Sequence, residues 1–192
     1  GIFYVRWMRG KTGAGAGPRY TWHDGTLQNE ASPGSDVFWS FLTERIIGYA
    51  QVSQENPALI GTFVDFENYH APKSGVGTLY TLSYDDEILA RFTRSKGIAL
   101  PTPLPAGRKT WLEEQKLHDD FAAFQVALWC QRCRKLRNAV DEINPQFQIF
   151  CCPGEGRCAF LAQAFYRELS TGQAPVVIAT EGTYGRATNL TP

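Results

Sequence analysis

The stretch LIGTFVDFE, residues 59–67, has the composition of a buried β-strand, yet it ends in two carboxylates, Asp65 and Glu67. Three more β-rich runs occur along the chain: IFYVRWM at 2–8, QFQIFCC at 146–152 and PVVIATEG at 175–182. Segments with helical patterns separate the four runs. This alternation predicts parallel strands joined by crossover helices in one α/β domain over residues 1–192.

The helical segments can be located from their spacing. In SDVFWSFLTERIIGYAQ, residues 35–51, apolar side chains recur every four residues and predict the first crossover helix. A short helix is expected in SYDDEILARF with Ser83 as its N-cap, and a long one over 111–143. A last helix is expected in RCAFLAQAFYRELSTG, ending at Gly172.

Four strands with crossover helices fit a doubly wound sheet or part of a (β/α)8 TIM barrel. A complete barrel typically needs about 250 residues, so this chain of 192 residues would supply about half of one. In that case the remaining strands would lie on another chain, in a homo-oligomer or outside this fragment.

Composition excludes some classes of function. Lys and Arg together number 19, as do Asp and Glu, so the chain lacks the positive field of a nucleic-acid-binding protein. No run of eighteen apolar residues is present, and no membrane-spanning helix is expected. The chain opens inside an apolar run at Gly1, which suggests an internal cut, so the localisation cannot be predicted from a targeting segment.

The five cysteines and the glycine-rich stretch do not predict a cofactor. Cys130 and Cys133 form a C-x-x-C on an expected helix, and Cys151 and Cys152 are adjacent, which departs from zinc-ribbon spacing. Buried thiols or a disulfide are the expectation. RGKTGAGAG at 9–17 lacks the spacing of a P-loop and of a dinucleotide fingerprint, and a loop is expected there.

Strand alternation places Phe63, Asp65 and Glu67 on one face, with same-side neighbours about 6.6 Å apart along the chain. Ligands of parallel α/β folds bind at the carboxyl ends of the strands. Two carboxylates there can hold different pKa values, so that one is an acid and one a base, as glycosidic cleavage requires. The alternative is that the pair caps a turn or binds basic neighbours.

A third carboxylate, Glu181, is expected at the same edge, at the end of the fourth run. Aromatic and polar residues that follow or end these runs suit a carbohydrate cleft, because aromatic faces pack on sugar rings and amides or imidazoles bind hydroxyls. The substrate-binding residues predicted on this basis are Arg6, Trp7, Asn68, Tyr69, His70, Tyr84 and Tyr184. Core packing explains any one of these aromatic residues equally well.

These residues resemble (β/α)8-barrel glycoside hydrolases, in particular a bacterial and metagenomic group with a DFE motif on a middle strand. The segments that carry the resemblance are NPALIGTFVDFENY, YDDEILARFTRSKGI, WLEEQKLHDDFAAFQ, LRNAVDEINPQFQI and PVVIATEGTYG. Asp65 and Glu67 are also similar to the tail of the chitinase signature D-x-x-D-x-D-x-E. Ile60 and Phe63 replace its other two acids, which argues against substrate-assisted cleavage.

The resemblance implies Glu67 as the acid/base, Asp65 as its partner, and Glu181 as a nucleophile or ligand contact, with no cofactor and a carbohydrate substrate. It also implies a periplasmic or secreted protein. Two alternatives stay open: an inactive carbohydrate-binding relative, and a metal-dependent hydrolase that uses Asp65, Glu67 and His70.

Overall fold

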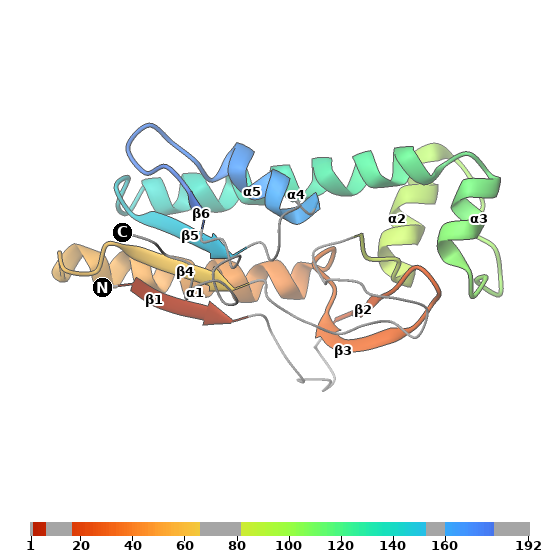
Figure 1. Cartoon of the computed structure of the whole chain (residues 1–192), viewed down its shortest axis with the longest axis horizontal. Helices are drawn as coiled ribbons and strands as arrows, with labels where there is room; N and C mark the ends of the chain where they lie inside the picture. The colour runs from red at the N-terminus through yellow and green to blue at the C-terminus, as the bar shows by residue number, and fades with distance from the viewer. Residues whose placement is uncertain (1, 7–16, 66–81, 153–159, 179–192) are drawn as a thin grey trace, which may run out of the picture.

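A computed structural model describes residues 2–6, 17–65, 82–152 and 160–178 of the chain (Figure 1). Helices occupy more of this described part than strands do. The elements in chain order are β1 (Ile2–Arg6), β2 (Arg19–Thr21), β3 (Leu27–Ala31), α1 (Asp36–Glu55), β4 (Gly61–Asp65), α2 (Asp86–Lys96), α3 (Arg108–Glu114), α4 (His118–Asp141), β5 (Gln148–Cys152), α5 (Phe160–Glu168) and β6 (Val177–Ile178).

One sheet is parallel, with the strand order β1-β4-β5-β6, and each of the four predicted β-rich runs contains one of its strands. The first three strands have five residues each, whereas β6 has two. At the start of β4 the two backbones approach closely, because a Cβ added to Gly61 would lie 2.3 Å from the carbonyl oxygen of Gln148. Glycine is therefore required at this position.

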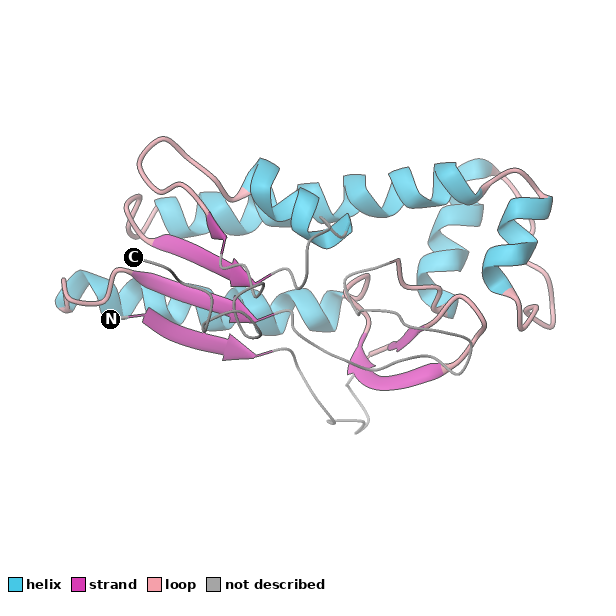
Figure 2. Ribbon diagram, in the orientation of Figure 1, coloured by secondary structure: helices cyan, strands magenta, loops and turns pink. Residues whose placement is uncertain are grey.

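The prediction that the chain forms half of a (β/α)8 TIM barrel is wrong. The parallel sheet is open, because β1 and β6 each have a single strand neighbour in the described part of the chain. The last strand is only a two-residue edge, with Val177 36% and Ile178 45% exposed. A separate antiparallel pair, β2 with β3, stands where the barrel pattern would lead directly from β1 into its helix (Figure 2).

Helices cover one face of the parallel sheet (Figure 2). The residues of β4 and β5 on this face, Thr62, Val64, Ile149 and Cys151, are all buried. They pack with the apolar stripes of α1, α4 and α5 in one core, whereas Phe63 and Phe150 on the other face are half-buried. The strong alternation of burial along β4 therefore follows from a one-sided helical cover.

The first predicted helix is confirmed as α1. Its N-cap is Ser35, whose hydroxyl accepts a hydrogen bond from the Phe38 amide at 3.1 Å. Its buried stripe includes Phe38, Leu42, Ile46 and Ala50, the positions that recur every four residues in the sequence. Amphipathic spacing was thus sufficient to locate this helix.

The other helices differ from the predictions at their ends. The long helix expected over 111–143 is two helices, α3 and α4, separated at Lys116, whose φ is 57°. Helix α5 ends at Glu168, before the predicted Gly172. The N-cap of α2 is Asp85 and not Ser83, because the Asp85 carboxylate accepts from the Ile88 amide at 3.0 Å.

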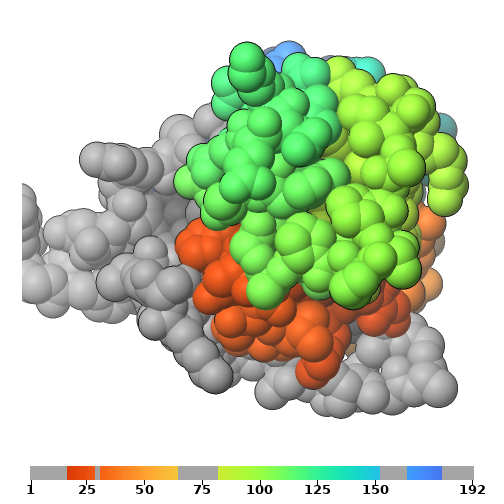
Figure 3. Space-filling view, turned by 90° about the vertical axis from the view of Figure 1, so that its right-hand side faces the viewer, coloured from red at the N-terminus to blue at the C-terminus, as the bar shows by residue number. Residues whose placement is uncertain are grey.

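The antiparallel pair and helices α2 and α3 form the end of the molecule toward which the parallel strands point (Figures 1 and 3). Tyr20 and Trp22 of this region are buried against each other, with ring centroids 5.0 Å apart. The turn between β2 and β3 packs on the first turn of α3, because the Lys109 amide donates to the His23 carbonyl at 3.1 Å. This layer lies beyond the carboxyl ends of the strands.

Candidate site at the carboxyl end of the parallel sheet

The carboxyl ends of β1, β4 and β5 lie at one edge of the sheet, next to the antiparallel pair (Figure 1). Parallel pairing puts Arg6, Asp65 and Cys152 in register at this edge, with Asp65 in the middle. Neighbouring strands in a sheet are about 4.8 Å apart. An acidic residue therefore ends the internal strand with a basic residue beside it and a cysteine on the other side.

Local sequence explains why Asp65 ends the strand. Thr62 and Val64 are buried under the helices, and alternation assigns Phe63 and Asp65 to the opposite face. Asp65 is the last residue of β4, as the sequence predicts, and the predicted direction of its side chain stays a prediction.

Of the ten predicted site residues, the register brings two together, Arg6 and Asp65. Glu67, Glu181, Trp7, Asn68, Tyr69, His70 and Tyr184 lie outside the described residues. Their convergence at this edge, on which the predicted site depends, stays a prediction.

Tyr84, the tenth predicted residue, belongs to the layer beyond the sheet and is buried. Its amide donates to the Thr21 carbonyl of β2 at 2.8 Å, and its ring packs on Phe121 of α4 at a centroid distance of 5.4 Å. Its hydroxyl lies 2.9 Å from Nε2 of His118. With an exposed fraction of 6%, Tyr84 is a core residue of the described structure, and its predicted role in substrate binding stays a prediction.

The environment of Tyr84 disfavours its ionised form. Burial, and to a smaller extent the nearby Glu113 carboxylate, raise the pKa of its hydroxyl well above the usual range. At ordinary pH the Tyr84 side chain is therefore a neutral phenol, and it is this form that hydrogen-bonds to His118. The pair joins the segment before α2 to the start of α4.

A buried polar network fixes the position of this segment. The Asp85 carboxylate, 2% exposed, accepts hydrogen bonds from the hydroxyls of Ser32 at 2.5 Å and Ser83 at 2.7 Å. The Gln125 side chain pairs with the Ser83 backbone, accepting from its amide at 3.2 Å and donating to its carbonyl at 2.9 Å. Every carboxylate oxygen of Asp85 is engaged, so the network is structural rather than reactive.

Residue spacing alone does not reveal two features of this region. Cys152 was treated only as one of five cysteines, although its place at the end of a strand run could have put it beside Asp65. The antiparallel pair was not predicted, although Asp24-Gly25 is a hairpin signal, and Gly25 has a φ of 84°.

The described cysteines Cys130, Cys133 and Cys151 are all buried, in agreement with the expectation of buried thiols. Within the described ranges, no group of three or more His, Cys, Asp and Glu residues is arranged to hold a metal ion. None of the helices in those ranges has the length and apolar character of a membrane span.

Neither a protein-family model nor a curated protein matches the chain. The resemblance to glycoside hydrolases therefore rests on the sequence segments quoted above.

Proposed function

We propose that the protein cleaves a glycosidic bond in an oligo- or polysaccharide by carboxylate catalysis at the carboxyl end of its parallel sheet. The observation that carries this proposal is the position of Asp65, which ends an internal strand at the edge where α/β folds bind ligands. The proposal does not depend on a barrel fold, because open parallel sheets also bind their ligands at the carboxyl ends of the strands.

The register supports different roles for the two acids of the D-x-E motif. Arg6 is the register partner of Asp65 on the neighbouring strand, and a nearby cation favours the ionised form of a carboxylate. A charged Asp65 in turn disfavours ionisation of Glu67, two residues further along the chain. This assigns the anion to Asp65 and the transferable proton to Glu67.

In this scheme the Glu67 carboxylic acid donates its proton to the glycosidic oxygen as the bond to the leaving sugar breaks. The Asp65 carboxylate stabilises the positive charge that develops on the sugar ring. Glu181 is the candidate for the second carboxylate that attacks the ring or activates water, as the resemblance implies. No redox cofactor is needed for this reaction.

Hydrolysis of a panel of aryl glycosides, measured together with oligosaccharide binding, tests the proposal. Glu67→Gln is expected to lower kcat by about 100-fold or more, which is the contribution of a positioned general acid. Glu114→Gln, which changes an exposed acid of α3 in the same way, should leave kcat unchanged.

Three outcomes contradict the proposal. Full activity of Glu67→Gln removes this residue from the mechanism. Oligosaccharide binding without turnover by the unmodified protein indicates a binding protein instead of an enzyme. Activity that is lost with a chelator and restored by a divalent cation indicates the metal-dependent alternative.

A further inference from the structure

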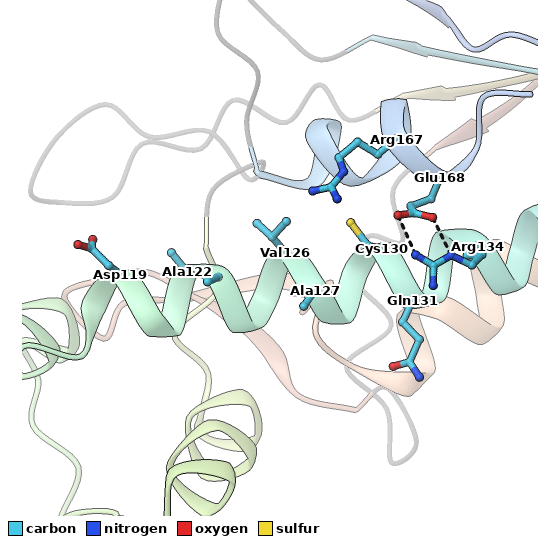
Figure 4. Close-up of a pocket in the computed structure, with 10 residues that line it drawn as sticks. Asp119, Ala122, Val126, Ala127, Cys130, Gln131, Arg134, Arg167 and Glu168 are labelled. Atoms are coloured by element: carbon cyan, nitrogen blue, oxygen red, sulfur yellow. Dashed lines mark hydrogen bonds and ion pairs between the residues drawn. The ribbon is translucent and has the colours of Figure 1, made fainter.

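A pocket of about 660 Å³ lies between α4 and the end of α5 (Figure 4). Its floor is one face of α4, on which Ala122, Val126 and Cys130 recur every four residues. These side chains are short and leave space between the two helices. The volume is that of a small-molecule site, for which about 300–1,000 Å³ is usual.

One end of the pocket is closed by a fixed ion pair. Arg134 of α4 donates to both carboxylate oxygens of Glu168, from Nε at 2.8 Å and from Nη2 at 3.0 Å. This two-point geometry holds both side chains in place and uses the charge of Glu168. Both oxygens of Glu168 are therefore engaged by Arg134, so no direct hydrogen bond from Glu168 holds a second cation.

That second cation is Arg167, which lines the same pocket from α5 (Figure 4). Among the ion pairs of the described residues, none includes Arg167. The carboxylate of Asp119 lies at the other end of the pocket (Figure 4). The pocket thus combines an apolar floor with a guanidinium that forms no direct ion pair among the described residues, although its charge also acts on the Glu168 carboxylate.

The thiol of Cys130 forms part of the wall beside these charges (Figure 4). Burial raises the pKa of this thiol above its usual range. At ordinary pH it therefore contributes a neutral, weakly polar surface and no second negative charge. A buried neutral thiol reacts slowly, and a ligand that fills the pocket should shield Cys130 further and slow its alkylation.

We propose that this pocket binds a small organic anion with an apolar body. The acidic group of the ligand pairs with Arg167, and its body covers Ala122 and Val126. A guanidinium and an anion form a strong charge-assisted hydrogen bond, while the apolar body gains by leaving water. This site is separate from the carbohydrate site and does not depend on it.

Titration with 8-anilinonaphthalene-1-sulfonate, an aromatic sulfonate that fluoresces when bound, tests the proposal. N-phenyl-1-naphthylamine has the same apolar body without the anion and serves as the uncharged probe. Arg167→Gln is expected to weaken binding of the sulfonate by about tenfold, as for loss of a hydrogen bond to a charged group, and to leave binding of the amine unchanged. Lys135→Gln, an exposed cation of α4 outside the pocket, should change neither.

Two further measurements locate the probe. Ala123→Trp places a large side chain at an exposed position of the lining, where the core is not disturbed, and should abolish binding of both probes. The bound sulfonate should also slow alkylation of Cys130, read by peptide mass spectrometry. Equal effects of Arg167→Gln and Lys135→Gln, or unchanged binding in Ala123→Trp, would overturn the proposal.

Discussion

Substitution of Asp85 tests quantitatively whether its buried hydrogen bonds stabilise the layer beyond the sheet. In Asp85→Ala the first turn of α2 loses its cap at the Ile88 amide, which costs about 1 kcal/mol. The hydroxyls of Ser32 and Ser83 also lose their shared acceptor. These two hydroxyls lie 3.1 Å apart and can bond each other, so one buried donor is left unsatisfied, at about 1–3 kcal/mol.

The sum is about 3 kcal/mol of lost stability for Asp85→Ala. For a chain of this length the melting temperature would fall by roughly 6–12 °C. Urea unfolding followed by tryptophan fluorescence measures the free energy directly, with the slope checking that the transition stays two-state.

The neighbouring acid provides a matched control. Asp86 forms an ion pair with Arg108 at 2.7 Å, but its side chain is 71% exposed. Surface pairs contribute about 1 kcal/mol or less, so Asp86→Ala should be much the milder change. If Asp85→Ala costs no more than Asp86→Ala, the buried network does not hold this layer together and the reasoning is refuted.

Two other predictions concern the sheet and the buried tyrosine. Gly61→Ala should destabilise the protein by about 1–3 kcal/mol, because the added Cβ clashes with the Gln148 carbonyl. Gly48→Ala in α1 is the control: its added Cβ meets nothing, and the change should stabilise the protein by about 0.5–1 kcal/mol. If thermal unfolding shows equal effects for the two variants, the close approach at Gly61 is contradicted. The raised pKa of Tyr84 means that its contribution to stability is complete below the usual tyrosine pKa of about 10 and is lost as the pH rises toward the folded-state value. Between about pH 9 and 11, the free energy of unfolding measured in urea should therefore fall less for Tyr84→Phe than for the unmodified protein. An identical pH dependence for the two proteins would argue against the burial of Tyr84.

The elements with strong apolar patterns were predictable from the sequence. The four strand runs are dense in β-branched and aromatic residues, and α1 has a clear stripe of apolar residues every four positions that begins after its N-cap, Ser35. Antiparallel β2 and β3 lack that signal, because β3 is the polar segment LQNEA and β2 has three residues. Only the Asp-Gly turn marked this pair, and it was not used.

The errors in helix ends have tertiary causes. Both Ser83 and Asp85 are good N-cap residues, and the contacts of Asp85 with Ser32 and Ile88 decide between them. The apolar spacing runs from α3 into α4 with no proline, so the break at Lys116 has no local signal.

The site was predictable only in part. Alternation along one strand correctly placed Asp65 at the sheet edge, and parallel register added Arg6 and Cys152. Tyr84 was assigned to the site because it is aromatic and follows the strand in sequence. Its partners lie in β2 and α4, and such long-range packing cannot be inferred from spacing.

The central claim is that Glu67 donates a proton to the leaving group, and leaving-group dependence tests it most directly. A phenyl glycoside needs this proton, whereas a 2,4-dinitrophenyl glycoside departs as a stable anion without it. The account predicts that Glu67→Gln lowers kcat/KM by about 100-fold or more for the first and far less for the second. An equal loss for both glycosides, or no loss for either, would contradict it.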